Sequence, residues 1–188
     1  DSGPADSGSA VPLPGAAGDL VISEILYDPE AMTPEGDFEW IEIHNPGTVA
    51  RELAGCTIAD ASASGMHLIA PATGSLVIAA GDYVVLARSD TPGFTPDYSY
   101  AGEFTLNNTG AGDTVTLACG SAGTLIDQVA YSPDGGWVDP VGASLSLDPS
   151  RLDHLMNDSP ASWCAATTAF ATGDLGTPGM PNPACTTP

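Results

Sequence analysis

The chain has 188 residues, 43% of them hydrophobic, which suits one domain with a sizeable core, and no apolar run is long enough to span a membrane. Twenty-four acidic residues face only three basic ones, Arg51, Arg88 and Arg151, so the net charge is −21. Because nucleic-acid and anionic-lipid surfaces are bound through basic patches, this composition argues against nucleic acid as a partner and against membrane insertion.

The first 18 residues are rich in Ser, Gly, Ala and Pro, which predicts a flexible arm ahead of a folded domain spanning residues 19–188. Within the arm, Pro12 and Pro14 remove backbone donors on one side only, leaving Val11 and Leu13 able to pair on the other. The arm is therefore either a Pro-rich linker or a one-sided edge strand. As an edge strand it would dock on a neighbouring copy of the chain.

The segment 38–46 alternates apolar and polar residues and predicts a central, half-buried strand. Its alternation places Ile41 and Ile43 on one face and Trp40, Glu42 and His44 on the other. A β-branched strand over residues 20–27 precedes it.

Further along the chain, short apolar runs bounded by Gly, Pro, Asp and Asn predict more strands, and no segment shows a sustained helical period. The expected strands cover residues 53–60, 66–69, 75–78, 83–88, 104–106, 114–119, 124–131 and, last, 144–147. Two of them, 75–78 and 83–88, are expected to form a strand-turn-strand unit. Many short strands without intervening helices predict an antiparallel β-sandwich or barrel.

Four cysteines occur without C-x-x-C spacing, which favours disulfides and an oxidising compartment over a zinc site. The long C-terminal loop needs a staple, and Cys164 with Cys185 would provide one. Cys56 would then pair with Cys119 and join two predicted strands. This is one of three possible connectivities.

Acidic residues crowd the loop between the first two predicted strands, and oxygen ligands of this kind suit Ca²⁺. Without nearby lysines these carboxylates repel one another unless they are solvated or bridged by a cation. The candidate calcium ligands are Asp28, Glu30, Glu35, Asp37 and Glu39. The alternative is an ordinary acidic loop.

Loop aromatics are candidates for ligand binding, namely Trp137 in a Gly-rich loop and Tyr98 and Tyr100 in the long loop before residue 103. Catalysis finds little support: there is no G-x-S-x-G motif, no lysine, and the three histidines are isolated. Glu24 and Glu42 would act as an acid/base pair only if they faced each other in a substrate cleft, and we expect Glu42 on a solvated face.

Several stretches in order resemble the lamin tail domain, a family found in nuclear lamins and in secreted and surface proteins of bacteria. The matching stretches are residues 21–25, 36–45, 53–60, 81–87, 106–108, 112–117, 126–131 and the Gly-Thr-Pro-Gly-containing segment 176–182. The resemblance implies an all-β, immunoglobulin-like antiparallel β-sandwich with long loops and disulfides. It also implies an accessory or structural module without established catalytic residues, although fold alone transfers function poorly.

These features predict a secreted, non-enzymatic structural or interaction protein located outside the cell or on its surface after signal-peptide removal. The first hypothesis is a self-assembling filament or surface-layer subunit linked through Val11 and Leu13 of the arm, so that its partners are other copies of itself. The alternative is an accessory binding module, stabilised by Ca²⁺, for polysaccharide or another extracellular polymer.

Overall fold

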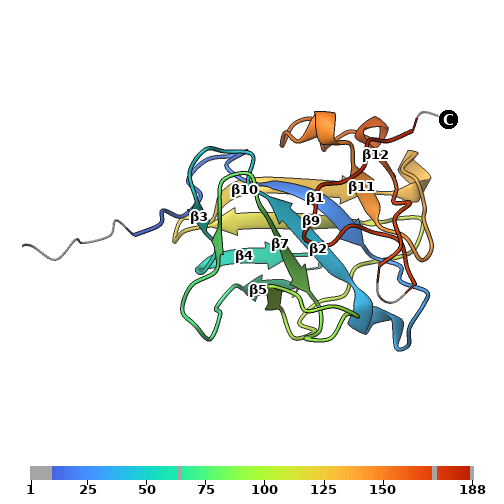
Figure 1. Cartoon of the computed structure of the whole chain (residues 1–188), viewed down its shortest axis with the longest axis horizontal. Coiled ribbons are helices and arrows are strands. Elements are labelled where there is room, and N and C mark those ends of the chain that lie inside the picture. Colours follow the sequence, from blue (N-terminus) through green and yellow to red (C-terminus); the bar gives the residue numbers. More distant parts are fainter. Residues whose placement is uncertain (1–9, 63–64, 171–172, 187–188) are drawn as a thin grey trace, which may run out of the picture.

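The computed structural model describes residues 10–62, 65–170 and 173–186, which form β-strands joined by loops and single 3₁₀ turns (Figure 1). The strands are β1 (Val21–Leu26), β2 (Trp40–His44), β3 (Arg51–Glu52), β4 (Cys56–Ala59), β5 (Met66–Leu68), β6 (Val77–Ile78), β7 (Tyr83–Ala87), β8 (Tyr98–Ser99), β9 (Asp113–Cys119), β10 (Thr124–Tyr131), β11 (Leu145–Leu147) and β12 (Trp163–Ala165). The 3₁₀ turns are η1 (Glu35–Phe38), η2 (Pro133–Gly135), η3 (Pro149–Arg151) and η4 (Pro160–Ser162).

Two sheets pack against each other, as the sequence predicts. The first contains six strands in the order β12-β11-β1-β2-β7-β8, and the second contains four in the order β10-β9-β4-β5. In Figure 1 the diagonal strands β1, β2 and β7 cross in front of the more horizontal β4, β9 and β10. A two-stranded ribbon, β3-β6, closes one end. The architecture is all-β and consistent with an immunoglobulin-like sandwich.

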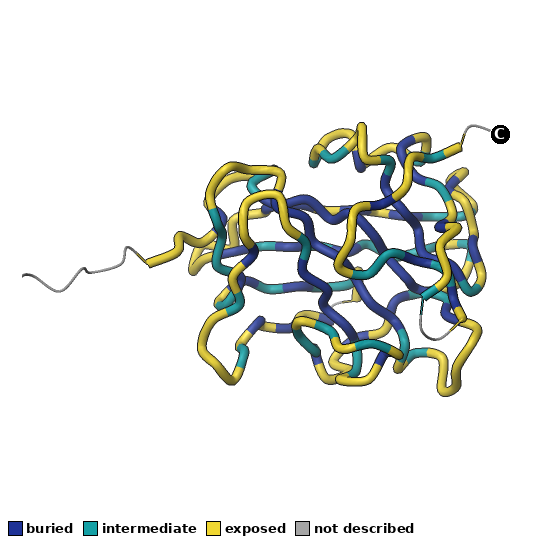
Figure 2. The backbone as a smooth tube through the Cα atoms, viewed as in Figure 1, coloured by how far each residue is buried: buried dark blue, intermediate teal, exposed yellow. Residues whose placement is uncertain are grey.

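The core lies between the inner faces of the two sheets. In Figure 2 the tube is buried along most of β1, β2 and β7, whereas buried residues alternate with less buried ones along β4, β9 and β10. Ile41 and Ile43 of β2 project into it, as their alternation predicts, and meet Ile58 of β4 and Leu117 of β9 in one cluster. Each such side chain contributes about 1.5–3 kcal/mol when it is fully removed from water. The inward half of the β2 prediction is therefore confirmed.

The predicted hairpin of residues 75–78 and 83–88 is wrong, because the connection crosses between sheets. Strand β6 pairs with β3, whereas β7 pairs with β2. Asn45 holds this crossing: its side-chain amide donates to the Ile78 carbonyl at 3.1 Å, and its own carbonyl accepts from Gly81 N at 2.9 Å.

Two other strand predictions need correction. Residues 104–106 form no strand, since Leu106 N donates to the Glu39 carboxyl at 2.9 Å. Strand β11 is not the last, because β12 pairs with it antiparallel, Leu147 opposite Trp163. The pairing adds the outermost strand of the six-stranded sheet at that edge.

The described part of the predicted arm, residues 10–18, lies against its own domain. The Pro12 carbonyl accepts from Glu52 N of β3 at 2.9 Å, and Gly18 N donates to the Ile126 carbonyl of β10 at 2.9 Å. The segment is not a strand, and Val11 and Leu13 remain exposed. Residues 1–9 of the predicted arm lie outside the described residues.

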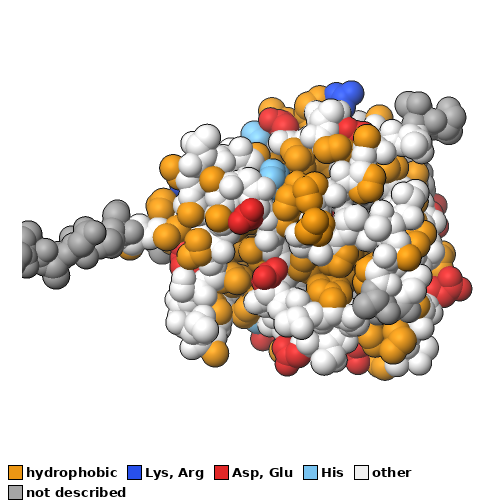
Figure 3. Space-filling view, viewed as in Figure 1, with side chains coloured by type: hydrophobic (Ala, Val, Ile, Leu, Met, Phe, Trp, Pro, Cys, Tyr) orange, Lys and Arg blue, Asp and Glu red, His pale blue; other side chains and the backbone are white. Residues whose placement is uncertain are grey.

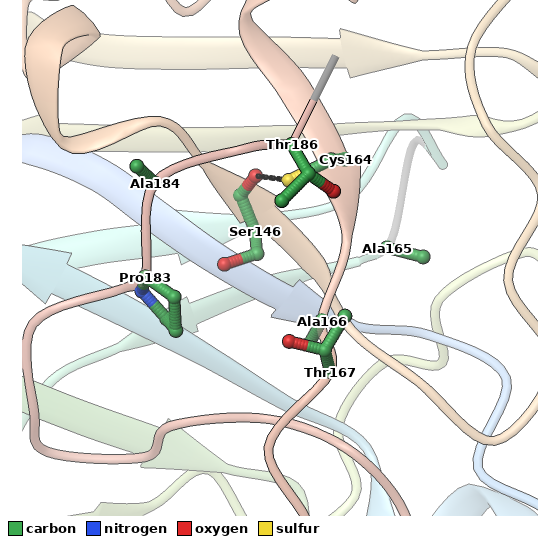
Figure 4. A pocket seen from close by; sticks show the side chains of 8 residues that line it. All are labelled: Ser146, Cys164, Ala165, Ala166, Thr167, Pro183, Ala184 and Thr186. Carbon is green, nitrogen blue, oxygen red and sulfur yellow. Dashed lines mark hydrogen bonds between the residues drawn. The ribbon is translucent and has the colours of Figure 1, made fainter. Parts of the chain in front are cut away.

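Both predicted disulfides are formed. Cys56 of β4 lies directly opposite Cys119 of β9 and is bonded to it, and Cys164 of β12 is bonded to Cys185 near the C-terminus. In the chain-entropy model, closing a loop of the Cys164–Cys185 size contributes about 3 kcal/mol. Beside this second disulfide, a pocket of about 50 Å³ separates Ser146 from the segment 183–186 (Figure 4), which leaves no room for an organic ligand.

The C-terminal cover, defined here as residues 166–170 and 173–185, lies across the outer face of the six-stranded sheet (Figure 1). Phe170 packs edge-on against Trp40 at a centroid distance of 6.0 Å. The Asn182 amide donates to the Ser23 carbonyl at 2.8 Å and to the Leu147 carbonyl at 3.0 Å. The cover therefore converts the outward face of β1, β2 and β11 into a second buried layer.

Candidate interaction surface

Beneath the C-terminal cover lies a pair of acidic side chains. The antiparallel register of β1 and β2 sets Glu24 opposite Glu42, and both are fully buried. Glu24 accepts from the backbone N–H and the hydroxyl of Thr177, each at 3.0 Å, and Glu42 accepts from Gly179 N at 2.8 Å. The expectation that Glu42 lies on a solvated face is wrong, because the cover excludes solvent from it.

Burial also changes the protonation of this pair. Loss of hydration raises the pKa of Glu24 to about 7, although its hydrogen bonds to Ser144 and Thr177 oppose the shift. Burial raises the pKa of Glu42 well above its ordinary value, and the neighbouring Glu24 raises it further. A general acid must reach a substrate atom. These carboxyl groups instead hydrogen-bond to backbone and hydroxyl groups of the cover and of neighbouring strands, so their role is structural.

The five predicted calcium ligands do not converge as a group, although two of them, Asp28 and Glu35, lie within hydrogen-bond distance of each other. Glu39 is buried and accepts from Leu106 N, and burial raises its pKa to about 8. Asp37 pairs with Arg88 at 3.3 Å. Asp28 and Glu35 both accept from the amide of Asn108, while Glu30 lies beside Gly142. Across residues 10–62, 65–170 and 173–186, no group of three or more His, Cys, Asp or Glu side chains is arranged to hold a metal ion.

The predicted ligand-binding aromatics do not form an exposed platform. Trp137 is only 8% exposed and packs against Trp163 at 5.8 Å between ring centroids. Tyr100 is fully buried and stacks on Phe104 at 4.3 Å. Tyr98 is partly buried, with its hydroxyl 2.7 Å from His67 Nε2. The exposure expected for Trp137 and Tyr100 is wrong, because their loops fold back onto the core.

The exposed feature that stands out is the outer face of the four-stranded sheet, which we call the neutral face. Its side chains stand in cross-strand rows fixed by the strand registers. One row is Leu68, Thr57, Ala118 and Leu125; the next is Met66, Ala59, Thr116 and Gln128; the last is Thr114 and Ala130. All ten are exposed or intermediate, and Met66 and Leu68 are 64% and 55% exposed.

None of these ten positions carries a charge, although the chain carries 24 acidic residues. Acidic residues adjoin the neutral face instead, since Asp60 follows β4 and Asp113 opens β9. From strand spacings of about 4.8 Å and a two-residue repeat of about 6.8 Å, ten such positions cover about 330 Å². This area is in the range of the largest surface patch on an ordinary monomer, and such patches are often functional.

The opposite side of the molecule differs. Figure 3 views it from the C-terminal cover, where hydrophobic and uncharged atoms are interrupted by scattered acidic side chains. The arginines lie elsewhere than on the neutral face: Arg51 pairs with Asp19 at 2.7 Å, and Arg88 pairs with Asp37. The neutral face is thus the larger charge-free surface that the strand registers define.

Sequence reasoning missed the neutral face, although its signal is present. Alternate residues of the strands predicted at 53–60, 114–119 and 124–131 are Thr, Ala and Gln, without a charge between them. Charged and aromatic side chains are the usual signal of a site, and in this fold Glu42, Tyr100 and Trp137 are buried and Asp37 is paired.

The fold defines an immunoglobulin-like β-sandwich, and this architecture with its two disulfides is compatible with an interaction or structural module. The family model of the Lamin Tail Domain matches residues 14–133, nearly two thirds of the chain. The chain therefore belongs to the lamin tail domain family. A search of curated proteins finds no match to it. Among the helices in the described ranges, none has the length and hydrophobicity needed to cross a membrane.

Proposed function

We propose that this chain is a secreted, non-enzymatic structural module that associates with other copies of itself through the neutral face. The observation that carries the proposal is the absence of charge from ten neighbouring outward positions on a chain of net charge −21. The centres of protein interfaces are depleted in charged residues in the same way.

The cysteines support an extracellular setting. All four are paired, and structural disulfides persist mainly in oxidising compartments. The high acidity is compatible with this setting, because a large net charge keeps an exposed module soluble.

The neutral face replaces the arm as the surface for assembly. Pro12 bonds to Glu52 of its own chain, so the arm is held on its own domain, while Val11 and Leu13 remain exposed. A filament linked through the arm would require residues 10–18, which are not a strand here, to become one on docking.

A polysaccharide or another extracellular polymer is the alternative partner. With Trp137 and Tyr100 buried, such a ligand would also have to use the neutral face, where threonine hydroxyls offer hydrogen bonds to an uncharged polymer. The two partners can be distinguished because only the first requires self-association.

The test is sedimentation velocity of the full chain over a range of concentrations at 0.05 and 1 M NaCl. We expect association to strengthen at high salt, because salt screens repulsion between acidic copies while apolar contact persists. Ala59→Glu places a charge in the middle of the neutral face and should abolish association. Val141→Glu, at a position 58% exposed in a loop, is the matched control and should leave association unchanged.

The same variants test the alternative by sedimentation with insoluble chitin and cellulose. A chain that stays monomeric in all conditions would overturn self-association. Retention on the polymers that is lost with Ala59→Glu and kept with Val141→Glu would then favour the polysaccharide partner.

A further inference from the structure

Strand β5, which carries the exposed Met66 and Leu68, forms one edge of the four-stranded sheet. It pairs with β4 on one side, and among the described residues no strand pairs with its other side. Edge strands of this kind are normally guarded against pairing by lysine, proline or a bulge. The Met66-His67-Leu68 strand contains none of these three, although its length of three residues is itself a partial guard against edge pairing.

The backbone N–H and C=O groups of successive β5 residues point alternately toward β4 and away from it. Ile69 N donates to the Cys56 carbonyl at 2.8 Å, and the Ile69 carbonyl accepts from Gly55 N at 2.9 Å, so Ile69 faces β4. His67, two residues earlier and opposite Ile58, faces β4 as well. In an antiparallel ladder the intervening residues, Met66 and Leu68, therefore direct their N–H and C=O groups outward.

Ala70 is the next residue whose backbone groups point away from β4, and the open edge ends there. Ala70 N donates to the hydroxyl of Tyr98 at 3.1 Å, a residue of the other sheet. The hydroxyl of Tyr98 also lies 2.7 Å from His67 Nε2, which anchors the inner side of β5. The open edge thus comprises two outward-facing residues on a strand whose position is fixed.

We propose that β5 pairs antiparallel with β5 of a second copy about a twofold axis at His67, which joins two four-stranded sheets into one of eight strands. In this register Met66 lies opposite Leu68 of the second copy, and the converse pair follows from the symmetry. Each pair exchanges two backbone hydrogen bonds, because both members direct their backbone groups outward. This proposal rests on the self-association proposed above, but it places the contact at the β5 edge beside the neutral face rather than on the face itself.

Charge and symmetry favour a second copy as the occupant. On the outer face the side chains that come together are the uncharged Met66 and Leu68. The acidic group beside this edge, Glu103, pairs with His67 at 3.1 Å. The β5 edge of each copy pairs with the β5 edge of the other copy. The contact is therefore isologous, and assembly through this edge stops at a dimer. The two neutral faces become continuous, which doubles their area to about 660 Å².

The first test is Leu68→Pro in the full chain, examined by sedimentation velocity. Proline at this position removes one outward N–H and spares the ladder bonds to β4, and edge strands tolerate proline on their solvent side. We expect the wild-type dimer to become monomeric, with circular dichroism unchanged. A dimer that persists in Leu68→Pro at the wild-type dissociation constant would overturn the pairing.

The second test does not depend on that variant folding. Chains carrying Met66→Cys are mixed with chains carrying Leu68→Cys and oxidised mildly. Directly opposite residues in such a pair have Cα atoms about 5.5 Å apart, within the range for a disulfide. We expect crosslinked heterodimers in at least tenfold excess over the homodimers formed by either variant alone; equal yields, or no crosslink, would overturn the register.

The two proposals fail in different ways. Ala59 lies on β4, away from the open edge, and its exposed side chain belongs to the neutral face. If Ala59→Glu abolishes association while Leu68→Pro and the cysteine pair have no effect, the neutral face is the interface and the β5 pairing is wrong. If Leu68→Pro alone abolishes association, the edge is the interface and contact through the face is wrong.

Discussion

The outer face of the six-stranded sheet carries Glu24, Glu42 and Trp40 and is buried, whereas the outer face of the four-stranded sheet carries Thr, Ala and Leu and is open to solvent. The difference comes from the C-terminal cover, which spans only the first of these faces and is fastened by Cys164–Cys185. Side-chain polarity thus does not determine exposure in this domain. What determines it is which sheet the cover crosses.

The largest loss of stability should come from truncating a side chain on the covered outer face of the six-stranded sheet. Trp40→Ala removes a fully buried ring that packs against Phe94 and Phe170, and should lower the free energy of unfolding by about 3–5 kcal/mol. Leu125→Ala, on the open face, is the control and should cost under about 1 kcal/mol. Urea unfolding followed by circular dichroism measures both. Similar losses for the two variants would contradict the distinction between the faces.

Releasing the cover should have the next largest effect. Replacing Cys164 and Cys185 together by serine removes the loop constraint and should cost about 3 kcal/mol. The same unfolding experiment gives the loss, and tryptophan fluorescence should shift to longer wavelength as water reaches Trp40. An unchanged emission maximum would show that the cover stays in place without its disulfide.

The buried carboxyl groups should make the free energy of unfolding depend on pH. Burial raises the pKa of Glu24 to about 7 and that of Glu39 to about 8 in the folded chain, so the folded state holds protons that the unfolded chain releases near 4.5. The stabilisation is complete below about pH 4.5 and is lost as the pH rises through 7 to 8. The slope is about 1.4 kcal/mol per pH unit for each proton by which the states differ.

Unfolding midpoints measured from pH 5 to pH 8.5 should therefore fall with increasing pH. Glu42→Gln keeps the shape of the side chain and removes its charge, so it should raise stability at pH 8 and have little effect at pH 5, because burial raises the pKa of Glu42 well above its ordinary value. A midpoint that rises between pH 5 and pH 8 would show that these carboxyl groups are hydrated in the folded state.

The smallest effect should come from the open face. Ala59→Glu adds a charge at a partly exposed strand position and should change the free energy of unfolding by no more than about 0.5 kcal/mol. The variant that abolishes association should thus be nearly silent in stability. A loss of 2 kcal/mol or more would mean that Ala59 is packed in the monomer.

Period-two alternation, a local signal, was sufficient to divide the β2 residues between two faces and to predict a sandwich or barrel. The resemblance to a family implied the sandwich, and the disulfide pairing was one of three connectivities that the four cysteines allow. It did not predict that Trp40 and Glu42 are buried, since the residues that cover them, such as Phe170 and Gly179, lie more than 120 positions away and have no periodic pattern. The neutral face was missed for a related reason, since its residues are divided among the four strands β4, β5, β9 and β10. Its rows exist only once the register is known.

The two disulfides have a mechanical consequence. In Figure 1 the described chain enters at the end near β3 and leaves at the opposite end of the long axis, so tension applied through the termini pulls along the whole domain. Loops of 63 and 21 positions are closed covalently, and nearly half of the chain is withheld from extension even when every strand has separated. At about 3.5 Å per residue, reduction would lengthen the stretched molecule by well over 200 Å. With both disulfides intact, the domain can be extended only over a limited distance, and the redox state of its cysteines sets its maximum length.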